Sequence, residues 1–535
     1  MAVAQSPKLV ASNDSAQTSS ILLNDLVSKE LVFAVVGPAG SGTSWVATAL
    51  EARLTNAIAN SEVVVLKASQ AIESWADATG FKIDNTNKLS RAESLQNAGD
   101  KIRSKDPAGV AVSLIAEIRK IRDEKNQDGK PPQDQPFRVY ILDSLKNPAE
   151  VSLLRSVYQE AFCLIGVVCE NEKSRARLRD GKCNSSSGEM IDLFIQRDQD
   201  CGFSSGQKVS DTFHLSDFFV DNTQDRFLDK ENQKENPDWD VNDQLSRLID
   251  ILTFKKVMRP TASETGMFHA YGAQMTSACL SRQVGAALLD SAGNLLATGK
   301  NEVPSAGGGV YGGGFHVDPK NDYRCANSNE YCSSNKHQNQ IIEELKETLP
   351  QLADIESKDL KEALKKTGIG RLLEFSRAVH AEMDALLTAA RQSISPVGSR
   401  LFVTTFPCHY CARHIVAAGV DEVQYIEPYP KSLAFNLHGD AIERSKGQWV
   451  SPSDYQIAHN NLIIKSSDNN AKPKVLFRAF TGVAPRLYRQ AFMKDRKLKN
   501  NEGIMHFGKP EWSSGLLSEN YQSIEKKLVE NMLGG

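Results

Sequence analysis

The residue types best suited to chemistry gather in two short segments on either side of position 400. His380 and Glu382 stand two residues apart in His-Ala-Glu, and Cys408 and Cys411 stand three apart in Pro-Cys-His-Tyr-Cys. Cysteines three apart in a helical turn face the same side, and a helix N-terminus favours the thiolate form that binds metal. One imidazole and two thiolates therefore predict a zinc site made of His380, Cys408 and Cys411.

The number of ligands decides what such a zinc site can do. Three protein ligands leave one tetrahedral position for water, which is typical of a catalytic site, and zinc lowers the pKa of that water towards about 7. Glu382 is then placed to accept the water's proton and pass it to a substrate. A closed structural site, with His409 or His414 as a fourth ligand, is the alternative. The acid–base position of Glu382 favours the catalytic interpretation.

The elements expected around these residues follow an αββαβαβ order. A helix over 260–282 precedes two strands joined by a short turn, and His380 lies inside the next helix. The cysteine pair begins the helix that follows the third strand. Hydrophobic periodicity places these later elements at strands 284–290 and 295–299, helix 371–392, strand 400–404, helix 409–419 and strand 422–427.

At these residues the sequence resembles the deoxycytidylate deaminase branch of the cytidine deaminase-like superfamily, over about 260–430. The matching stretches are Ser-Arg-Gln-Val-Gly-Ala at 281–286, Gly-Lys-Asn at 299–301, and the two zinc segments. The resemblance implies that water attacks C4 of cytosine, that Glu382 carries protons to N3 and to the leaving ammonia, and that Asn301 contacts the nucleotide. Arg282 and Lys300 are candidate phosphate-binding cations. Asp384 departs from the asparagine common in the family.

A glycine-rich segment, Gly-Pro-Ala-Gly-Ser-Gly-Thr-Ser, occupies 37–44 after the apolar run 31–36. It follows the Walker A pattern except that Thr43 stands in the place of lysine. Backbone N–H groups can still cradle a phosphate, Ser44 can reach Mg²⁺, and Asp143 follows an apolar strand as a Walker B aspartate does. Without the lysine, phosphoryl transfer is disfavoured; a simple tight turn is the alternative. The candidate nucleotide-binding residues are Gly37, Gly40, Gly42, Thr43, Ser44 and Asp143.

The whole chain is expected to be an α/β protein with two domains. Apolar runs alternating with helical segments predict a P-loop NTPase-like parallel-sheet domain over 28–220, after a flexible segment 1–27. A charged linker covers 221–259. A cytidine deaminase-like αβα domain covers 260–535, with an insertion at 305–370 and a C-terminal extension at 430–535. Within the insertion, His316, Cys325, Cys332 and His337 predict a second, structural zinc, with unligated thiols as the alternative.

Composition limits the possible partners. The chain has 535 residues, a net charge of −3 and nine cysteines. No apolar run reaches the roughly 18 residues of a membrane span, and the polar first 20 residues lack the features of a secretory signal. Reduced thiols and a cytoplasmic location are expected. The acidic balance and the lack of a basic tract argue against duplex DNA as a partner.

This arrangement of domains resembles the bacterial anti-phage dCTP/dCMP deaminases. The resemblance implies free deoxycytidine nucleotides as substrates, nucleotide depletion in defence against phage, a homo-oligomer, and regulation through the N-terminal domain by a nucleotide or RNA. Two other hypotheses stay open. A polynucleotide cytosine or adenine editor would share the zinc chemistry, although the charge balance disfavours it. A nucleotide-responsive signalling protein would place the activity in the N-terminal domain.

Overall fold

A computed structural model describes most of the chain after residue 26. The described residues are 27–125, 136–181, 188–199, 206–229, 232–312, 322–328, 332–365, 367, 376–429, 432–447, 449–455, 473–494, 497–505, 508 and 517–533. The predicted N-terminal segment lies almost entirely outside them. Among the described helices, none combines the length and the apolar character that crossing a membrane requires.

The first sheet is built on β1 (Glu30–Val36), whose residues are nearly all buried. Its neighbours β3 (Phe137–Asp143) and β4 (Phe162–Val168) both run parallel to it, and β2 (Ser61–Lys67) and β5 (Phe218–Asp221) extend the parallel sheet. The strand order is β14-β5-β4-β1-β3-β2. The runs read from the sequence as buried parallel strands are strands of this sheet.

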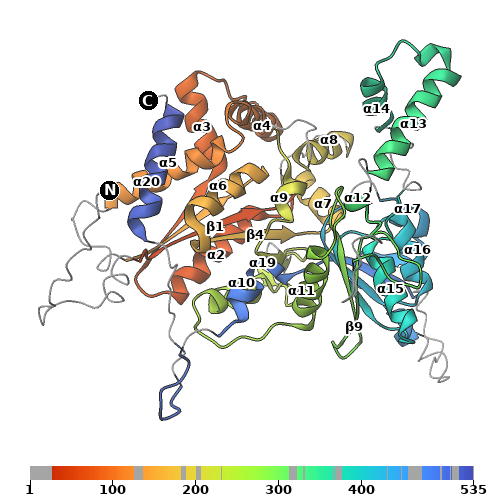
Figure 1. The fold of residues 1–535 in the computed structure, drawn as a ribbon. Helices are drawn as coiled ribbons and strands as arrows, with labels where there is room; N and C mark the ends of the chain where they lie inside the picture. Colours follow the sequence, from red (N-terminus) through yellow and green to blue (C-terminus); the bar gives the residue numbers. More distant parts are fainter. Residues whose placement is uncertain are drawn as a thin grey trace, which may run out of the picture.

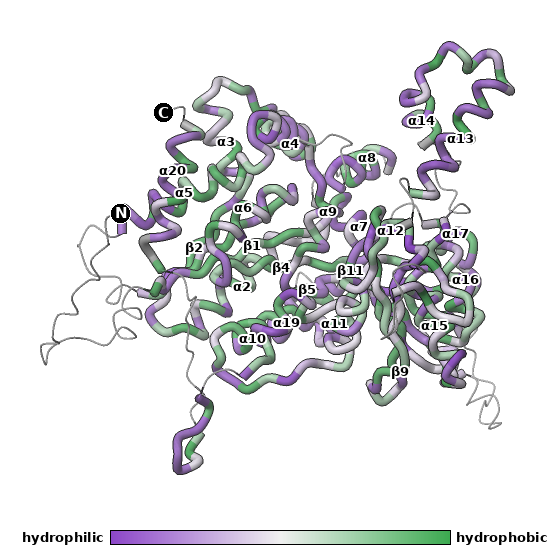
Figure 2. Tube along the Cα trace, viewed as in Figure 1, coloured by the Kyte–Doolittle hydropathy of each residue, from purple (hydrophilic) through white to green (hydrophobic). Residues whose placement is uncertain are grey.

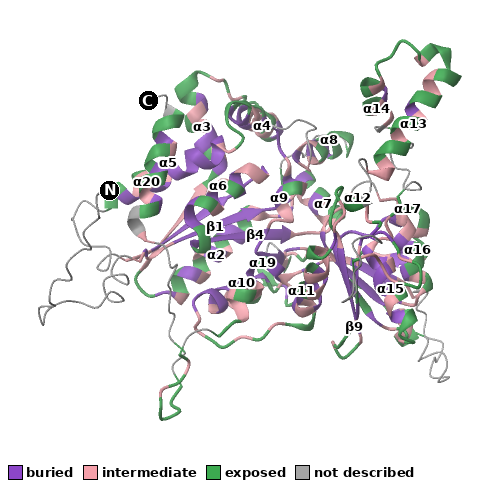
Figure 3. Cartoon of the chain, viewed as in Figure 1, coloured by how far each residue is buried: buried purple, intermediate pink, exposed green. Residues whose placement is uncertain are grey.

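Successive side chains of β1 point to opposite faces of the sheet. Since both sets are apolar, both faces of the first sheet must be covered, and helices cover them. Leu31, Phe33 and Val35 pack on one side and Val32, Ala34 and Val36 on the other. The first face is covered by α2 (Thr43–Ala57), α10 (Val241–Leu252) and α19 (Pro485–Phe492). The opposite face is covered by α3 (Ala68–Thr79), α4 (Lys88–Lys105), α5 (Gly109–Lys125), α6 (Pro148–Tyr158) and α20 (Ser518–Leu533) (Figure 1). β1 and β4 are predominantly hydrophobic in Figure 2 and buried in Figure 3.

Three further helices lie beside the first sheet, and a short hairpin precedes α10. The helices are α7 (Asn171–Gly181), α8 (Gly188–Gln199) and α9 (Val209–Phe213). The hairpin pairs β6 (Phe227–Asp229) with β7 (Lys234–Glu235).

The second sheet has the order β12-β13-β11-β10-β8-β9. β10 (Arg400–Thr405) and β11 (Glu422–Glu427) are parallel, while β8 (Gly285–Leu289) pairs antiparallel with β10 and with the edge strand β9 (Leu295–Lys300). One face carries α15 (Ala381–Arg391), α16 (His409–Ala417) and α17 (Ala434–His438). The other face carries α11 (Ala262–Met275), at the contact with the first sheet.

The structure divides the chain differently from the predicted domain boundaries. The expected linker 221–259 contains α10, whose apolar side chains belong to the core of the first sheet. The expected extension 430–535 is shared between the sheets. β12 (Ile442–Glu443) and β13 (Val475–Ala479) complete the second sheet, whereas β14 (Gly482–Val483) pairs with β5 in the first. α20 returns to contact α5 (Figure 1). These long-range pairings leave no local sequence pattern.

A buried carboxylate links helix α11 of the second sheet to elements of the first. Glu264, in the first turn of α11, is 1% exposed. Its oxygens accept hydrogen bonds from both terminal nitrogens of Arg247 on α10, at 2.6 and 2.8 Å, and from the backbone N–H groups of Val483 and Thr261, each at 2.8 Å. α11 is therefore anchored to α10 and to β14.

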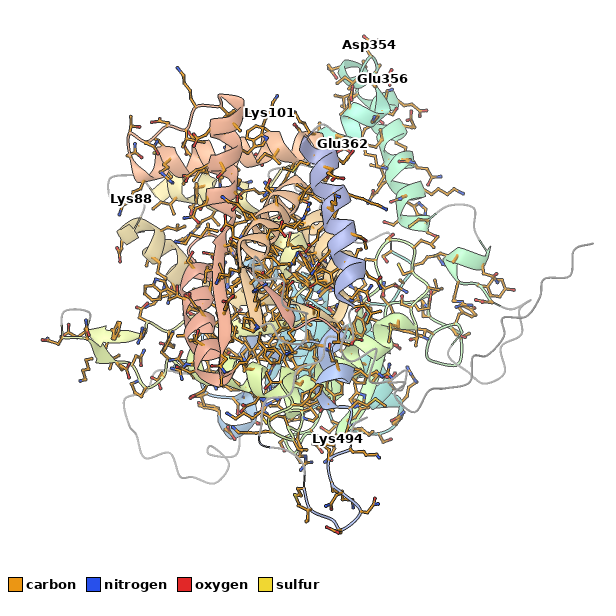
Figure 4. All side chains as sticks on the ribbon, turned by 90° about the vertical axis from the view of Figure 1, so that its left-hand side faces the viewer. Lys88, Lys101, Asp354, Glu356, Glu362 and Lys494 are labelled. Carbon is orange, nitrogen blue, oxygen red and sulfur yellow. The ribbon has the colours of Figure 1, made fainter. Side chains whose placement is uncertain are left out.

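The predicted insertion contains a projecting arm. After the short α12 (Cys325–Ser328), the helices α13 (Ser333–Thr348) and α14 (Ser357–Lys365) contact each other, and Ile342 and Leu360 are buried. Asp354 and Glu356 lie at the outer end of the arm in Figure 4, and both are exposed. This part of the chain extends away from both sheets (Figure 1).

Candidate active site

His380 is held at the start of α15 by the backbone before it. Val379 and Glu302 form an isolated antiparallel bridge, in which each residue's N–H donates to the other's carbonyl oxygen at 3.0 and 3.3 Å. Because Val379 has extended pairing, the helix begins at Ala381 and His380 is its N-cap. The prediction of a helix starting at 371 is therefore wrong for 376–380, and 371–375 lie outside the described residues.

Gly299 allows α15 to lie directly on the second sheet. A Cβ atom at this position of β9 would come within 2.2 Å of the Ala381 carbonyl oxygen and 2.3 Å of the Ala385 nitrogen. Real Cβ atoms do not approach backbone atoms so closely, so any larger residue would push the helix away. The close packing sets the position of His380 and Glu382.

The two cysteines lie just after β10, at the start of α16. After β10 the chain turns through Pro407, and Cys408 is the N-cap of α16, with Cys411 in the first turn. His380 Nδ1 lies 3.3 Å from Cys408 Sγ and 3.4 Å from Cys411 Sγ. A tetrahedral zinc with ordinary Zn–S and Zn–N bonds separates such atoms by about 3.6 Å. The three side chains thus fit zinc.

No fourth ligand completes this cluster within the described part of the chain. His380, Cys408 and Cys411 are the residues whose ligand atoms lie within 4.8 Å of one another. His409 and His414, the alternative fourth ligands, are not among them. The Nδ1 atom of His409 is buried without a hydrogen-bond partner in the described residues. The geometry matches the catalytic form of the predicted site, in which one position stays open.

The electrostatics of the cluster place negative charge on one thiol. Hydrogen bonding from Cys411, together with His380, lowers the pKa of Cys408 to about 4. The contact with Cys408 raises the pKa of His380 to about 9, although burial opposes the shift. Hydrogen bonding to Cys408, reinforced by burial, raises the pKa of Cys411 well above its ordinary value. The cluster already stabilises a thiolate, which is the form that a metal requires.

Glu382 lies beside the cluster without belonging to it. The side chain is 4% exposed, and its carboxyl group contacts the Cys411 thiol. Burial raises the pKa of Glu382 to about 7, although the neighbouring His380 charge opposes the shift. A buried carboxyl group of this kind can both accept and donate a proton near neutral pH.

The side-chain amide of Asn301 forms hydrogen bonds with other residues of the protein. Its side-chain oxygen accepts from the Val284 N–H at 2.7 Å and from the Ser277 hydroxyl at 3.0 Å, and its side-chain nitrogen donates to the Arg282 carbonyl at 2.6 Å. It therefore braces the loop 277–284. A direct nucleotide contact stays a prediction.

Arg282 and Lys300, the two predicted phosphate-binding cations, lie in different surroundings. Arg282 lies 3.3 Å from Glu427, whose other oxygen accepts from Thr405 at 2.9 Å. Sequence reasoning missed Glu427, although a carboxylate ending a strand parallel to β10 was a signal.

Lys300 instead lines a cavity of about 1020 Å³ that contains none of the zinc ligands. The cavity lies among α11, the end of β9, the turn 305–312 and α15. Along α15, Asp384, Thr388 and Arg391 line it, so the helix that starts at His380 also borders this second space. Asp384, the departure from the family pattern, accepts a hydrogen bond from the Lys300 backbone N–H at 3.1 Å.

The predicted nucleotide-binding residues converge at the carboxyl end of the first sheet. Gly40 and Gly42 have φ angles of 83° and 86°, which lie in the left-handed region that glycine favours. Thr43 starts α2, and the Ser44 hydroxyl donates to Asp143 at the end of β3 at 2.6 Å. Gly37 follows β1 directly. The turn thus joins a central parallel strand to a helix N-terminus, with an acidic side chain beside its serine.

The predicted second zinc set does not assemble in the described residues. Cys325, Cys332 and His337 do not form a metal-binding group there, and His316 lies outside the described residues. The Cys332 thiol instead lies 3.5 Å from the Ser281 hydroxyl.

Comparisons with known proteins identify the zinc region. A family model described as the cytidine and deoxycytidylate deaminase zinc-binding region matches residues 260–427. The deoxycytidylate deaminase of Enterobacteria phage T2 is 31% identical over 165 residues, which are 30% of this chain and 78% of that protein. The deoxycytidylate deaminase of Enterobacteria phage T4 is 29% identical over 170 residues, which are 30% of this chain and 76% of that protein.

A solved structure is also similar in sequence to part of this chain. The dCMP deaminase from the cyanophage S-TIM5, in complex with dCMP and dUMP, is 25% identical, with a TM-score of 0.21. The match covers 34% of this chain and 93% of that chain.

Proposed function

Since the chain belongs to the deoxycytidylate deaminase family, we propose that its zinc-dependent deamination acts on free deoxycytidine nucleotides, dCMP and dCTP. The observation that carries this proposal is the cluster of His380, Cys408 and Cys411 beside the buried carboxyl group of Glu382. The reaction consumes water and a deoxycytidine nucleotide, and it forms a deoxyuridine nucleotide and ammonia.

The residues of the chain divide this chemistry between them. When zinc is bound by the cluster, it supplies a Lewis acid that acidifies water. Glu382 would take one proton from the attacking water and deliver it to N3 of the base, and it would then move the second proton, from the hydroxyl added at C4, to the departing amino group so that ammonia leaves. Its burial excludes bulk water from the proton path. We propose that Arg282, which pairs with Glu427 at the end of β11, binds a phosphate group of the substrate.

Small substrates are favoured over polynucleotides. The net charge is −3, and a protein that tracks a nucleic acid backbone ordinarily presents a basic groove. The T2 and T4 relatives are named for a mononucleotide substrate. Polynucleotide editing is therefore the second choice.

The glycine-rich turn supports a second, regulatory role. The Ser44–Asp143 hydrogen bond brings together the hydroxyl and carboxylate that hold Mg²⁺ in P-loop sites. We infer that this turn binds a nucleotide with Mg²⁺ and that binding controls the deaminase. The anchoring of α11 through Glu264 offers a physical connection between the two sheets.

The proposed chemistry and the domain arrangement together support a proposal for the biological role. Deamination of dCTP and dCMP depletes the precursors of DNA synthesis, so we propose a function in defence against phage. The protein is proposed to act as a homo-oligomer, with a nucleotide or RNA as regulator.

A substrate panel tests the proposed function. Purified zinc-loaded protein is incubated separately with dCMP, dCTP, and single-stranded DNA and RNA containing cytosine or adenine, and deaminated products are measured by mass spectrometry. Glu382→Ala protein, prepared in parallel, controls for contaminating deaminases. We expect dUMP or dUTP from the wild type alone. Editing of the oligonucleotides with both free nucleotides intact would instead establish the polynucleotide alternative.

A further inference from the structure

The glycine-rich turn is contacted by a lysine from the segment that follows β3. Lys146 lies three residues after Asp143, where β3 ends, and its Nζ atom lies 3.3 Å from the Gly37 carbonyl oxygen. The same Nζ lies 3.0 Å from one carboxylate oxygen of Asp198. A cation is therefore present at this turn, although Thr43 occupies the usual lysine position.

The turn and the lysine together hold an internal anion. Asp198, in the last turn of α8, is 2% exposed. Its second oxygen accepts a hydrogen bond from the backbone N–H of Ala39 at 2.8 Å. A loop N–H and a lysine around one anionic oxygen pair are the contacts that such a turn offers to a phosphate. The Asp198 carboxylate thus occupies the two groups, the Ala39 N–H and the Lys146 ammonium, that would otherwise be available to bind a phosphate.

A buried hydroxyl inside the turn has no partner. Ser41 is 0% exposed, and its Oγ atom has no hydrogen-bond partner among the described residues. This oxygen lies 2.5 Å from the position that a Cβ atom on Gly37 would take, so it points across the inside of the turn. Buried polar groups are ordinarily satisfied, and a ligand that enters the turn would satisfy this one.

The other cation at the turn is already committed to protein acceptors. Arg177 donates to the Asn222 carbonyl at 2.7 Å and to the Gln224 carbonyl at 3.0 Å, and it pairs with Asp225 at 3.1 Å. The side-chain ammonium of Lys146 has a single carboxylate partner among the described residues, Asp198, and can exchange it for another anion.

We propose that Lys146 supplies the phosphate-binding cation that position 43 lacks, and that Asp198 holds its place until a phosphate arrives. The ligand class is the phosphate chain of a nucleoside triphosphate with Mg²⁺. On binding, Asp198 gives up Lys146 and the Ala39 N–H, which then contact phosphate oxygens. The exchange is one anion for another, with no covalent step. This inference rests on the proposed nucleotide-binding role of the turn.

Two substitutions with opposite expected effects test the exchange. Binding of Mg²⁺ complexes of ATP and of pyrophosphate to full-length, zinc-loaded protein is measured by titration calorimetry. Lys146→Ala should weaken binding roughly ten- to hundredfold, the usual effect of losing a hydrogen bond to a charged group. Asp198→Asn should strengthen it severalfold, because the internal competitor loses its charge. If the substitutions change the affinities for ATP and for pyrophosphate equally, the turn recognises the phosphate chain. If wild type also binds ATP more tightly than pyrophosphate, the nucleoside contributes to binding as well.

The remaining outcomes separate this inference from the function on which it rests. Adding Thr43→Lys to Lys146→Ala should restore binding, which also shows that the parent variant is folded. Unchanged binding by Lys146→Ala would overturn the inference while leaving the nucleotide site in place. Parallel weakening by Lys146→Ala and Asp198→Asn would overturn it too, since a purely structural ion pair behaves in that way. Failure of wild type to bind either probe would overturn the nucleotide-binding role together with the inference.

Discussion

Gly299→Ala should damage the zinc site by pushing α15, which begins just after His380, away from β9. The added Cβ would meet the Ala381 carbonyl oxygen at 2.2 Å, about 1.2 Å short of ordinary contact, which begins at 3.4 Å. Both nearest atoms are backbone, so no side chain can rotate away. The helix must withdraw by about 1 Å or the strand must bend. A displacement of this size at a catalytic group can lower kcat/KM about a hundredfold, and overpacking costs about 1–3 kcal/mol of stability.

The assay measures kcat/KM for dCMP, bound zinc by mass spectrometry and unfolding in urea. Gly272→Ala is the matched control, because a Cβ at Gly272 meets nothing within 4 Å and alanine favours a helix by about 1 kcal/mol. We expect that control to keep its zinc and to be at least as stable as the wild type, and Gly299→Ala to lose activity and zinc affinity. Wild-type kcat/KM and zinc content in Gly299→Ala would refute the reasoning that α15 is positioned by this contact.

Three further predictions concern the metal, the junction and the substrate. Removing zinc with a chelator should abolish deamination. In urea unfolding, the zinc-free protein should be less stable by about 3 kcal/mol than protein measured at a zinc concentration about a hundred times the dissociation constant, and added zinc should restore activity and stability. Glu264→Ala should cost about 3 kcal/mol in the same assay, because Arg247 and the Val483 N–H lose their acceptor, and Glu264→Gln should cost less. Arg282→Ala should raise the KM for dCMP about tenfold and leave kcat within about twofold of wild type. A fall in kcat with an unchanged KM would contradict a phosphate-binding role. Glu427→Gln should raise the KM less than Arg282→Ala does.

The zinc cluster could be predicted because its information is local. A cysteine pair three residues apart faces one side of a helical turn, and the histidine and the glutamate lie two residues apart in one short segment. The alternating apolar runs of the first sheet were equally visible, because buried parallel strands are continuous hydrophobic segments. The parallel α/β character follows directly from those runs.

Features that depend on distant pairing could not be predicted. The start of α15 is fixed by the bridge between Val379 and Glu302, which lie far apart in the sequence. β14 joins the first sheet although the residues just before it belong to the second. Lys146 and Asp198 meet only because β3 and α8 end beside the same turn. None of these contacts has a short-range pattern.

The proposed deamination depends most directly on Glu382 acting as the proton carrier at a zinc with three protein ligands. Its sharpest test compares wild type and Glu382→Gln by X-ray absorption at the zinc edge and by single-turnover deamination of dCMP. We predict two sulfur ligands, one imidazole and one light-atom ligand in both proteins, with deamination slowed at least about a hundredfold by the substitution. A third sulfur or second imidazole on the metal, or an undiminished rate in Glu382→Gln, would contradict it.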